Sequence, residues 1–357
     1  MTDQAKEEEN LTPVSEKFCL EQIKNSNVKV SHKYTLGSLD SQTFCVRFDP
    51  LDKYIAQGCG DGTIRIYNVF SGKQSFVLNT EMEQPMPTTQ IRWRPTASKA
   101  VTKNVIISVN ANGALQHWHT TSGKLLHTIW DELNQLFTVD YNPDGTQFVT
   151  GGSDCIVRVY DEQTRKIFVE LEGGGAGEPG HSNRVFCVKF DPEDPNFVIS
   201  GGWDNNIKVW DIRTKSPVRS LYGPYVCGDS IDITYEIGDE PVLLSGSYRD
   251  SRTLQLWSYD TMSHFIDIDT DEGLPSEKPC LLYCCQFNKT NKELFIAGGS
   301  GSNEVKIFDL KQEFKPVAQI KDLSRACFSV DWSNSGDMFA IGGGDGVIRV
   351  FNVVSEV

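Results

Sequence analysis

The pattern of apolar and polar positions is clearest in the segment 180–211, GHSNRVFCVKFDPEDPNFVISGGWDNNIKVWD. The runs at 185–190 and 206–210 alternate between the two kinds of residue, which is the period of a half-buried strand. The mostly apolar run at 197–200 has the composition of a fully buried strand. The intervening DPEDPN and GGWDNN are rich in Asp, Asn, Pro and Gly, which favour tight reversals. The segment therefore predicts three antiparallel strands joined by two tight turns.

The same pattern recurs seven times along the chain. In each copy a turn residue, most often Asp or Asn, is followed six or seven positions later by an aromatic residue that ends the third strand. These aromatic residues are Tyr67, Trp118, Tyr160, Trp210, Trp257, Phe308 and Phe351, spaced 42 to 51 residues apart. The longer intervals predict insertions, which we place at 81–87, 95–103, 173–180 and 269–279. Repeats of about 40–45 residues with four strands each are typical of a propeller, in which each repeat supplies one blade.

A fourth strand follows the first three in every repeat except the last, for example KLLHTIW at 124–130. The seventh repeat stops at RVFNVVSEV, whereas HKYTLGS at 32–38 precedes the first repeat and has no hairpin partner near it in the sequence. We therefore expect 32–38 to pair with 349–354. Such a pairing closes the ring and removes the exposed sheet edges of an open array.

The segment 180–211 closely resembles a WD repeat. The four-residue hydrogen-bond network of that family has a counterpart at each place, in His181, Ser200, Asp204 and Trp210. An unpaired buried carboxylate costs several kcal/mol, and an imidazole, a hydroxyl and an indole N–H can supply the donors that Asp204 needs. The resemblance therefore implies a structural tetrad rather than a hydrolase triad.

The resemblance covers about residues 30–357 and implies an all-β fold, a seven-bladed WD-repeat β-propeller at 29–357 closed by an N-terminal strand. The chain departs from the family pattern in places. Trp-Asp occurs as the third-strand ending only at Trp210, and Phe308 and Phe351 cannot donate a hydrogen bond. Blades six and seven must therefore rely more on packing. Residues 1–28 are expected to form a flexible acidic tail, with a short helix at 16–25 as the alternative.

Composition limits the function further. The chain has 34 Lys and Arg against 48 Asp and Glu, a net charge of −14. This balance argues against non-specific binding to nucleic acid and to anionic membranes, and no apolar run approaches the roughly 20 residues of a membrane helix. Ten cysteines without CxxC pairs predict buried, reduced thiols in an intracellular, cytoplasmic protein, with a nuclear location left open, and no metal site.

A recurrent position in the first strand of each repeat predicts a binding site. In five of the seven repeats this residue is aromatic: Phe44, Phe137, Phe186, Tyr283 and Phe328. In WD proteins partners often meet the face that carries this position, so the resemblance implies a partner-binding site there, with Arg184, Trp203 and Arg249 beside it. Trp, Tyr and Arg are enriched in interface hot spots. The alternative, that the rings fill the blades, stays open because aromatic residues in strands are usually core.

No cluster of catalytic residues emerges, and GGGAGEPG at 173–180 lacks the ending of a phosphate loop. We therefore expect a non-enzymatic scaffold without cofactors, which binds other proteins or peptides as a subunit of a larger complex. A cytoskeletal or ciliary complex is one setting, because GPYVCGDSIDI at 223–233, followed by LLSGSYRDSRTLQLW at 243–257, resembles a variant found in WD proteins of ciliated and flagellated cells. The alternative is a peptide-reading adaptor, either a ubiquitin-ligase substrate receptor or a chromatin-complex subunit. An acidic or aromatic pocket at the mouth of the channel would favour that alternative.

Overall fold

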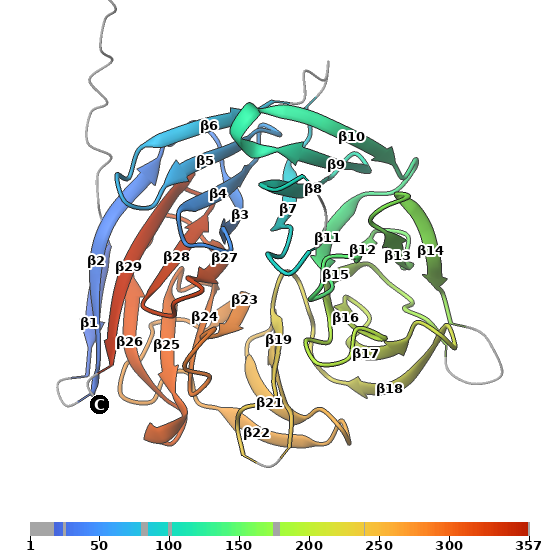
Figure 1. The fold of residues 1–357 in the computed structure, drawn as a ribbon. Coiled ribbons are helices and arrows are strands. Elements are labelled where there is room, and N and C mark those ends of the chain that lie inside the picture. Colours follow the sequence, from blue (N-terminus) through green and yellow to red (C-terminus); the bar gives the residue numbers. More distant parts are fainter. Residues whose placement is uncertain are drawn as a thin grey trace, which may run out of the picture.

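Seven antiparallel sheets surround a central channel, as the computed structural model in Figure 1 shows. The structure describes residues 18–23, 26–79, 85–98, 102–173, 179–238 and 240–355. The predicted insertions at 81–87, 95–103 and 173–180 therefore lie partly outside the described residues. Each sheet is one blade, and its strands follow one another from the channel outward. The fold is the predicted seven-bladed β-propeller.

The strands of the first four blades run in chain order from the inside outward. Blade 1 has β3 (Thr43–Phe48), β4 (Tyr54–Cys59), β5 (Ile64–Asn68) and β6 (Gln74–Leu78). Blade 2 has β7 (Thr88–Trp93), β8 (Val105–Asn110), β9 (Ala114–His119) and β10 (Lys124–Trp130), with the short 3-10 helix η1 (Thr120–Ser122). Blade 3 has β11 (Leu136–Tyr141), β12 (Gln147–Gly152), β13 (Val157–Asp161) and β14 (Lys166–Leu171). Blade 4 has β15 (Val185–Phe190), β16 (Phe197–Gly202), β17 (Asn206–Asp211) and β18 (Ser216–Tyr222).

The last three blades include the two strands from the N-terminal region. Blade 5 has β19 (Ile231–Thr234), β20 (Val242–Gly246), β21 (Leu254–Ser258) and β22 (His264–Ile268). Blade 6 has β23 (Cys280–Phe287), β24 (Leu294–Gly301), β25 (Val305–Asp309), β26 (Lys315–Lys321) and β1 (Cys19–Gln22), with η2 (Leu310–Gln312) before β26. Blade 7 has β27 (Cys327–Trp332), β28 (Met338–Gly343), β29 (Val347–Ser355) and β2 (Val28–Gly37). We call the face with the turns between second and third strands the upper face, and the opposite face the lower face.

The ring closes through β2, which forms the outer strand of blade 7. It pairs antiparallel with β29, with Lys29 opposite Val354 and Thr35 opposite Arg349. The predicted pairing of 32–38 with 349–354 is thus confirmed, and it extends further toward the N-terminus than expected. Figure 1 shows β2 and β29 side by side.

A second overlap joins β1 to blade 6. Cys19–Gln22 pairs antiparallel with β26, with Cys19 opposite Lys321 and Gln22 opposite Ala318. A helix at 16–25 is therefore wrong for these residues. The free N–H and C=O groups along the edge of β26 accept a strand, while Phe18 and Leu20 pack against the core that blades 6 and 7 share. The rest of the predicted tail, residues 1–17, lies outside the described residues.

The core lies within and between the blades. One cluster of buried side chains, for example, joins Val159 of blade 3 to Val198 and Trp210 of blade 4. All seven aromatic residues at the third-strand ends are buried. In blades 2, 4 and 5 this residue is a Trp that donates to a serine Oγ on the second strand: Trp118 to Ser108 (3.2 Å), Trp210 to Ser200 (2.7 Å) and Trp257 to Ser245 (2.9 Å).

Blades 3, 6 and 7 replace that hydrogen bond with a stack of two rings. Their third-strand aromatic lies face to face with a Phe on the second strand: Tyr160 on Phe148 (centroids 4.9 Å apart), Phe308 on Phe295 (5.0 Å) and Phe351 on Phe339 (5.0 Å). Offset stacking of this kind adds about 0.5–1.5 kcal/mol beyond the burial of the rings. Packing therefore takes over where the third-strand residue is Phe, as the sequence predicts. No helix among the described residues has the length and apolar character needed to cross a membrane.

Truncation from the N-terminus tests both overlaps. Removing residues 1–17 leaves every described strand intact, so the melting temperature should stay almost unchanged. Removing 1–26 also deletes β1 and should lower the melting temperature by a few degrees. Removing 1–38 deletes β2 as well and exposes the edge of β29, so that the protein should aggregate. Thermal unfolding and size-exclusion chromatography measure these effects. Identical behaviour of the shortest and longest truncations would contradict the closure.

Candidate functional site at the channel mouth

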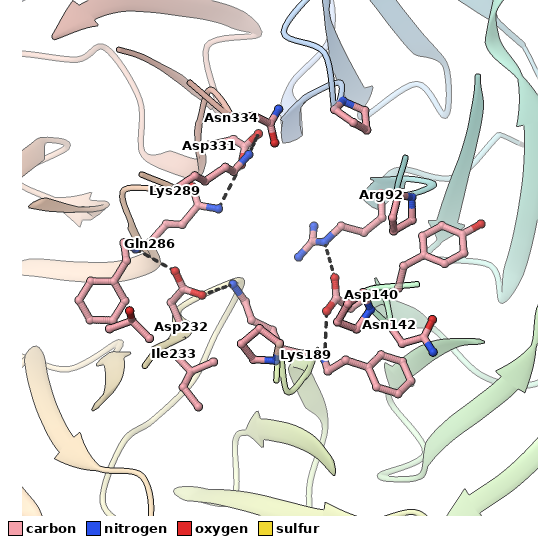
Figure 2. A pocket seen from close by; sticks show the side chains of 18 of the residues that line it. Arg92, Asp140, Asn142, Lys189, Asp232, Ile233, Gln286, Lys289, Asp331 and Asn334 are labelled. Carbon is pink, nitrogen blue, oxygen red and sulfur yellow. Dashed lines mark hydrogen bonds and ion pairs between the residues drawn. The ribbon is translucent and has the colours of Figure 1, made fainter. Parts of the chain in front are cut away.

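The wall of the channel carries one side chain per blade at the same place in the innermost strand. These residues are Arg47, Arg92, Asp140, Lys189, Asp232, Gln286 and Asp331, which we call the channel ring. Figure 2 shows six of them, all except Arg47, directed toward the axis of the channel. The lower end of the channel opens into a basin of about 550 Å³ that these side chains line.

Six members of the channel ring join their blade to the next by hydrogen bonds and ion pairs, whereas Arg47 bonds back to Ser329 and Val330 of blade 7. Where the residue is Asp or Gln, it accepts a backbone N–H of the following blade: Asp140 from Phe190 (3.0 Å), Asp232 from Phe287 (2.8 Å), Gln286 from Trp332 (2.9 Å) and Asp331 from Phe48 (2.7 Å). Where it is a cation, Arg92 and Lys189 reach the Asp of the following blade at 3.0 and 2.9 Å. Because these charges are paired with one another, we assign the ring a structural role.

A second tier of hydrogen bonds lies two residues earlier on the innermost strands. There too, a side chain of one blade accepts a backbone N–H of the next: Gln90 from Val139 (2.6 Å), Thr138 from Val188 (3.1 Å) and Ser329 from Val46 (3.1 Å). The innermost strand is an edge of its own sheet. Its N–H groups that point away from the sheet need other partners when they are buried. Neighbouring blades therefore satisfy one another along the channel wall.

The side chain of Asp229 reaches across the channel above the channel ring. It precedes β19 in blade 5, yet its carboxylate bonds to Arg47 of blade 1 and to Arg92 of blade 2, the latter at 2.9 Å. Burial alone would raise the pKa of Asp229, but the cations of Arg92, Lys189 and Arg47 outweigh burial and hold the pKa well below the usual aspartate value. Asp229 is therefore a charged cross-channel strut, and its position makes it the floor of the upper half of the channel.

Above this strut lies a cavity of about 390 Å³ with aromatic walls. The structure brings together around it all five aromatic residues of the recurrent position, namely Phe44, Phe137, Phe186, Tyr283 and Phe328. Phe137 and Phe186 are stacked at 4.5 Å, and Tyr283 meets Phe328 edge to face at 5.3 Å. Each ring is partly exposed rather than buried in a blade. We call this cavity the aromatic mouth.

Two of the three neighbouring residues predicted for the site extend the rim of the aromatic mouth. The Trp203 ring packs against Phe186 at 4.9 Å, and the Arg184 guanidinium lies 5.2 Å from the centre of the Trp203 ring. The indole N–H of Trp203 donates to the Cys227 sulfur at 2.8 Å. Burial raises the pKa of Cys227 to about 11, so this group is a neutral thiol near neutral pH.

Arg249 does not belong to this group. Its guanidinium donates to the backbone carbonyls of Gly223 and Arg252, each at 3.0 Å, and to the side chain of Gln255 at 2.5 Å. These contacts use most of the donors of the Arg249 guanidinium, and Arg249 does not line the cavity. The structure therefore separates Arg249 from the other predicted residues.

The predicted tetrad forms a chain of hydrogen bonds in blade 4. Asp204 meets His181 Nδ1 at 2.8 Å, His181 Nε2 meets the Ser200 Oγ at 2.7 Å, and Trp210 donates to the same oxygen at 2.7 Å. Asp204 does not touch Ser200 or Trp210 directly, as a simple cluster would require; its remaining donors include the backbone N–H of Ser182. Burial would raise the pKa of Asp204, but the His181 hydrogen bond helps to keep it below the usual value.

Two features of the site were missed by the sequence analysis. The first is Asp229, whose signal in the sequence was an acid at a loop position together with two arginines, Arg47 and Arg92, on strands that contain no acidic residue. The second is the outer aromatic layer: Tyr248 lies 5.0 Å from Tyr283, and Tyr225 stacks on Trp203 at 6.1 Å. Within the part of the chain that the structure describes, no group of three or more His, Cys, Asp or Glu side chains could hold a metal ion.

Comparison with known protein families agrees with this architecture. The model of the WD domain, G-beta repeat, matches residues 31–68, 123–161, 177–211 and 315–352. Three of these segments begin at the fourth strand of one blade and end with the third strand of the next, as for 31–68, which spans β2 to β5. Over the described residues the chain has seven blades, of which six have four strands and blade 6 has five. It belongs to the WD40-repeat β-propeller family.

Several curated proteins are similar to this chain at low identity. The ribosome biogenesis protein WDR12 homolog of Drosophila yakuba is 23% identical over 316 residues, which span 84% of this chain and 69% of that protein. MST50-interacting protein 11 of Pyricularia oryzae is 26% identical over 182 residues, or 50% of this chain and 54% of that protein. Protein tipD of Dictyostelium discoideum is 23% identical over 221 residues, or 52% of this chain and 34% of that protein. None of these three names points to a cytoskeletal or ciliary structure.

Removing Asp229 should strongly destabilise the fold. In Asp229→Ala, Arg47 and Arg92 lose a buried counter-charge, which costs about 3–5 kcal/mol when one partner of a buried pair is deleted. Urea unfolding measures the loss. The pKa of Asp229 is depressed in the folded state, so its contribution is complete above the unfolded value of about 3.9 and disappears as the pH falls toward the folded value.

The same reasoning predicts the pH dependence of a milder variant. The difference in unfolding free energy between the wild type and Asp229→Asn should be constant from about pH 8 to about pH 5 and should shrink below about pH 4. A difference that instead disappears as the pH rises would contradict the assignment of Asp229 as an ionised strut.

Asp204 should act through stability rather than chemistry. Asp204→Ala leaves His181 and the Ser182 N–H without an acceptor, at about 1–3 kcal/mol for each group that stays buried. Glu277→Ala, which removes an exposed carboxylate, is the matched control and should change stability by no more than about 0.5 kcal/mol. Equal urea midpoints for both variants would show that the hydrogen-bond chain does not stabilise the blade.

Proposed function

We propose that this propeller is a non-enzymatic scaffold that binds a segment of a partner protein at the aromatic mouth. One observation carries the proposal: five rings from one repeat position line a single cavity of about 390 Å³. That volume lies within the roughly 300–1,000 Å³ of typical ligand pockets. If the rings served only to fill the blades, they would be buried like Phe308 and Phe351, whereas each stays partly exposed.

The chemistry of the aromatic mouth favours an apolar anchor. Its walls are aromatic, and the two charges at its floor, Arg47 and Asp229, already neutralise one another. An apolar or aromatic side chain that fills the cavity would gain about 1.5–3 kcal/mol from burial. The partner backbone would then run across the rim, where Arg184 and Trp203 offer a hydrogen-bond donor and a flat ring, both typical of hot spots.

The peptide-reading adaptor is the second candidate. It required an acidic or aromatic pocket at the channel mouth, and the aromatic mouth supports it. The two candidates differ in what suffices for binding, since an adaptor recognises a short motif whereas a scaffold also uses the wider surface. The name of the Drosophila relatives supports a complex of ribosome biogenesis as the setting, rather than a cytoskeletal or ciliary complex.

Variants of the rim test the proposal. Trp203→Ala and Arg184→Ala should each weaken partner binding by about 2 kcal/mol, roughly thirtyfold, because each removes a hot-spot contact. Their melting temperatures should change little, since both side chains are partly exposed. Phe168→Ala is the matched control, because Phe168 is an exposed ring on β14 away from the channel. Quantitative affinity purification compares the proteins retained by each variant.

The outcomes separate the two roles of these residues. A set of partners lost from both rim variants and kept by Phe168→Ala supports the proposal. Large losses of thermal stability without selective loss of partners would assign the rings to packing. Partners retained equally by all variants would overturn the assignment of the site to the aromatic mouth.

A further inference from the structure

A second apolar surface lies on the lower face, between blades 5 and 6. It is a groove of about 660 Å³, formed by the turn between β19 and β20, the end of β21, the start of β22 and the turn between β25 and β26. We propose that this lower groove docks an amphipathic, basic segment of a partner protein. The site is separate from the aromatic mouth, which opens on the upper face, and none of the residues that line one cavity lines the other.

The walls of the lower groove are apolar side chains that the fold does not fully cover. Ile237, Val242, Leu310 and Phe314 are partly buried against the core of blades 5 and 6. Phe265, at the start of the outer strand β22, is 63% exposed. These five residues belong to two turns and two strands, yet they line one depression. A continuous apolar surface of this kind, unlike single exposed residues, marks an interaction site.

The backbone conformation at Phe314 is energetically unfavourable. Glu313 and Phe314 both adopt left-handed conformations, with φ of +59° and +64°. This conformation costs about 1–2 kcal/mol for a residue other than glycine, and it is rare for a bulky side chain. The turn between β25 and β26 therefore directs an aromatic ring into the groove, where a glycine would form the same turn without strain.

The charges around the lower groove identify the occupant. The lining residues include Glu236, Glu240, Glu293 and Lys311, a net charge of −2 from three carboxylates and one ammonium. Glu293 pairs with Lys311 at 2.6 Å, and the exposed Glu240 accepts only the Ser258 hydroxyl, at 3.1 Å, among the contacts of the described residues. Carboxylates that flank an apolar floor complement a segment whose Leu, Ile or Phe side chains are followed by Lys or Arg.

The acidic N-terminal segment of this chain does not fit the lower groove. Residues 1–17 include the run Glu7, Glu8 and Glu9, which the groove carboxylates would repel. The chain also enters β1 beside Lys321, at the end of β26 opposite to Phe314. Both the charge and the direction of the chain therefore favour a partner segment as the occupant.

A pair of designed peptides tests the proposal with the purified full chain. The probe is a fluorescein-labelled peptide of about twelve residues that contains only Leu and Lys at helical spacing, and its counterpart replaces every Lys with Glu. Fluorescence anisotropy should show binding of the Leu/Lys peptide and at least tenfold weaker binding of the Leu/Glu peptide. The affinity should fall with added salt, because exposed charges are screened.

Two variants locate the peptide. Leu310→Ser/Phe314→Gly removes the apolar wall, while glycine relieves the left-handed strain and offsets part of the lost packing. Affinity should fall at least tenfold at a temperature where thermal unfolding shows the variant to be folded. Glu236→Gln/Glu240→Gln should weaken binding and flatten its salt dependence. Phe168→Ser removes a comparable exposed ring elsewhere and should bind like the wild type.

Trp203→Ala distinguishes the lower groove from the aromatic mouth. Unchanged binding of the Leu/Lys peptide by this variant supports the lower groove, whatever the fate of the proposed mouth function. Loss of binding in Trp203→Ala, retained binding in Leu310→Ser/Phe314→Gly, or equal binding of the two peptides would each overturn the proposal.

Discussion

A hydrogen bond between neighbouring blades is the interaction on which the rest of this propeller depends. The innermost strand of each sheet has N–H groups that point away from that sheet and have no partner within it. Side chains such as Asp232 and Asp331 of the preceding blade accept these groups, and the pattern repeats around the channel. The seven sheets are therefore joined not only by apolar packing but also by directional bonds, which fix the angle between blades and keep the channel at one width.

This bonding also shapes the candidate site. Because the ring and the Asp229 strut fill the middle of the channel with paired charges, the channel is divided into an upper cavity and a lower basin. The upper cavity then has a closed, neutral floor and aromatic walls. A cavity with this construction holds an apolar side chain better than a chain that threads through the channel. The rigid scaffold thus places a small adaptable surface at its centre, as binding proteins commonly do.

Much of this architecture could be predicted from the sequence because it follows from repetition. The spacing of third-strand aromatics, the unpaired segment 32–38 and the recurrent position of Phe44 and Phe186 are each visible when the repeats are aligned. The features that escaped prediction break the repetition. Asp229 acts across the channel on distant blades, β1 depends on an edge that only the assembled blade 6 presents, and the environment of Arg249 depends on how its own loop folds. Pattern along the chain does not encode such contacts between non-equivalent positions.

The double overlap at the N-terminus has a consequence for synthesis. Val28 pairs with Ser355, so β2 meets its partner β29 only after the strands between them in all seven blades have been synthesised. At ribosomal rates of about 5–20 residues per second, that delay is on the order of tens of seconds. During this time β2 and the growing array both present unpaired edges, and closure requires a contact of very high sequence separation, which slows folding. The strand that closes the finished ring is thus the one that waits longest for its partner during synthesis.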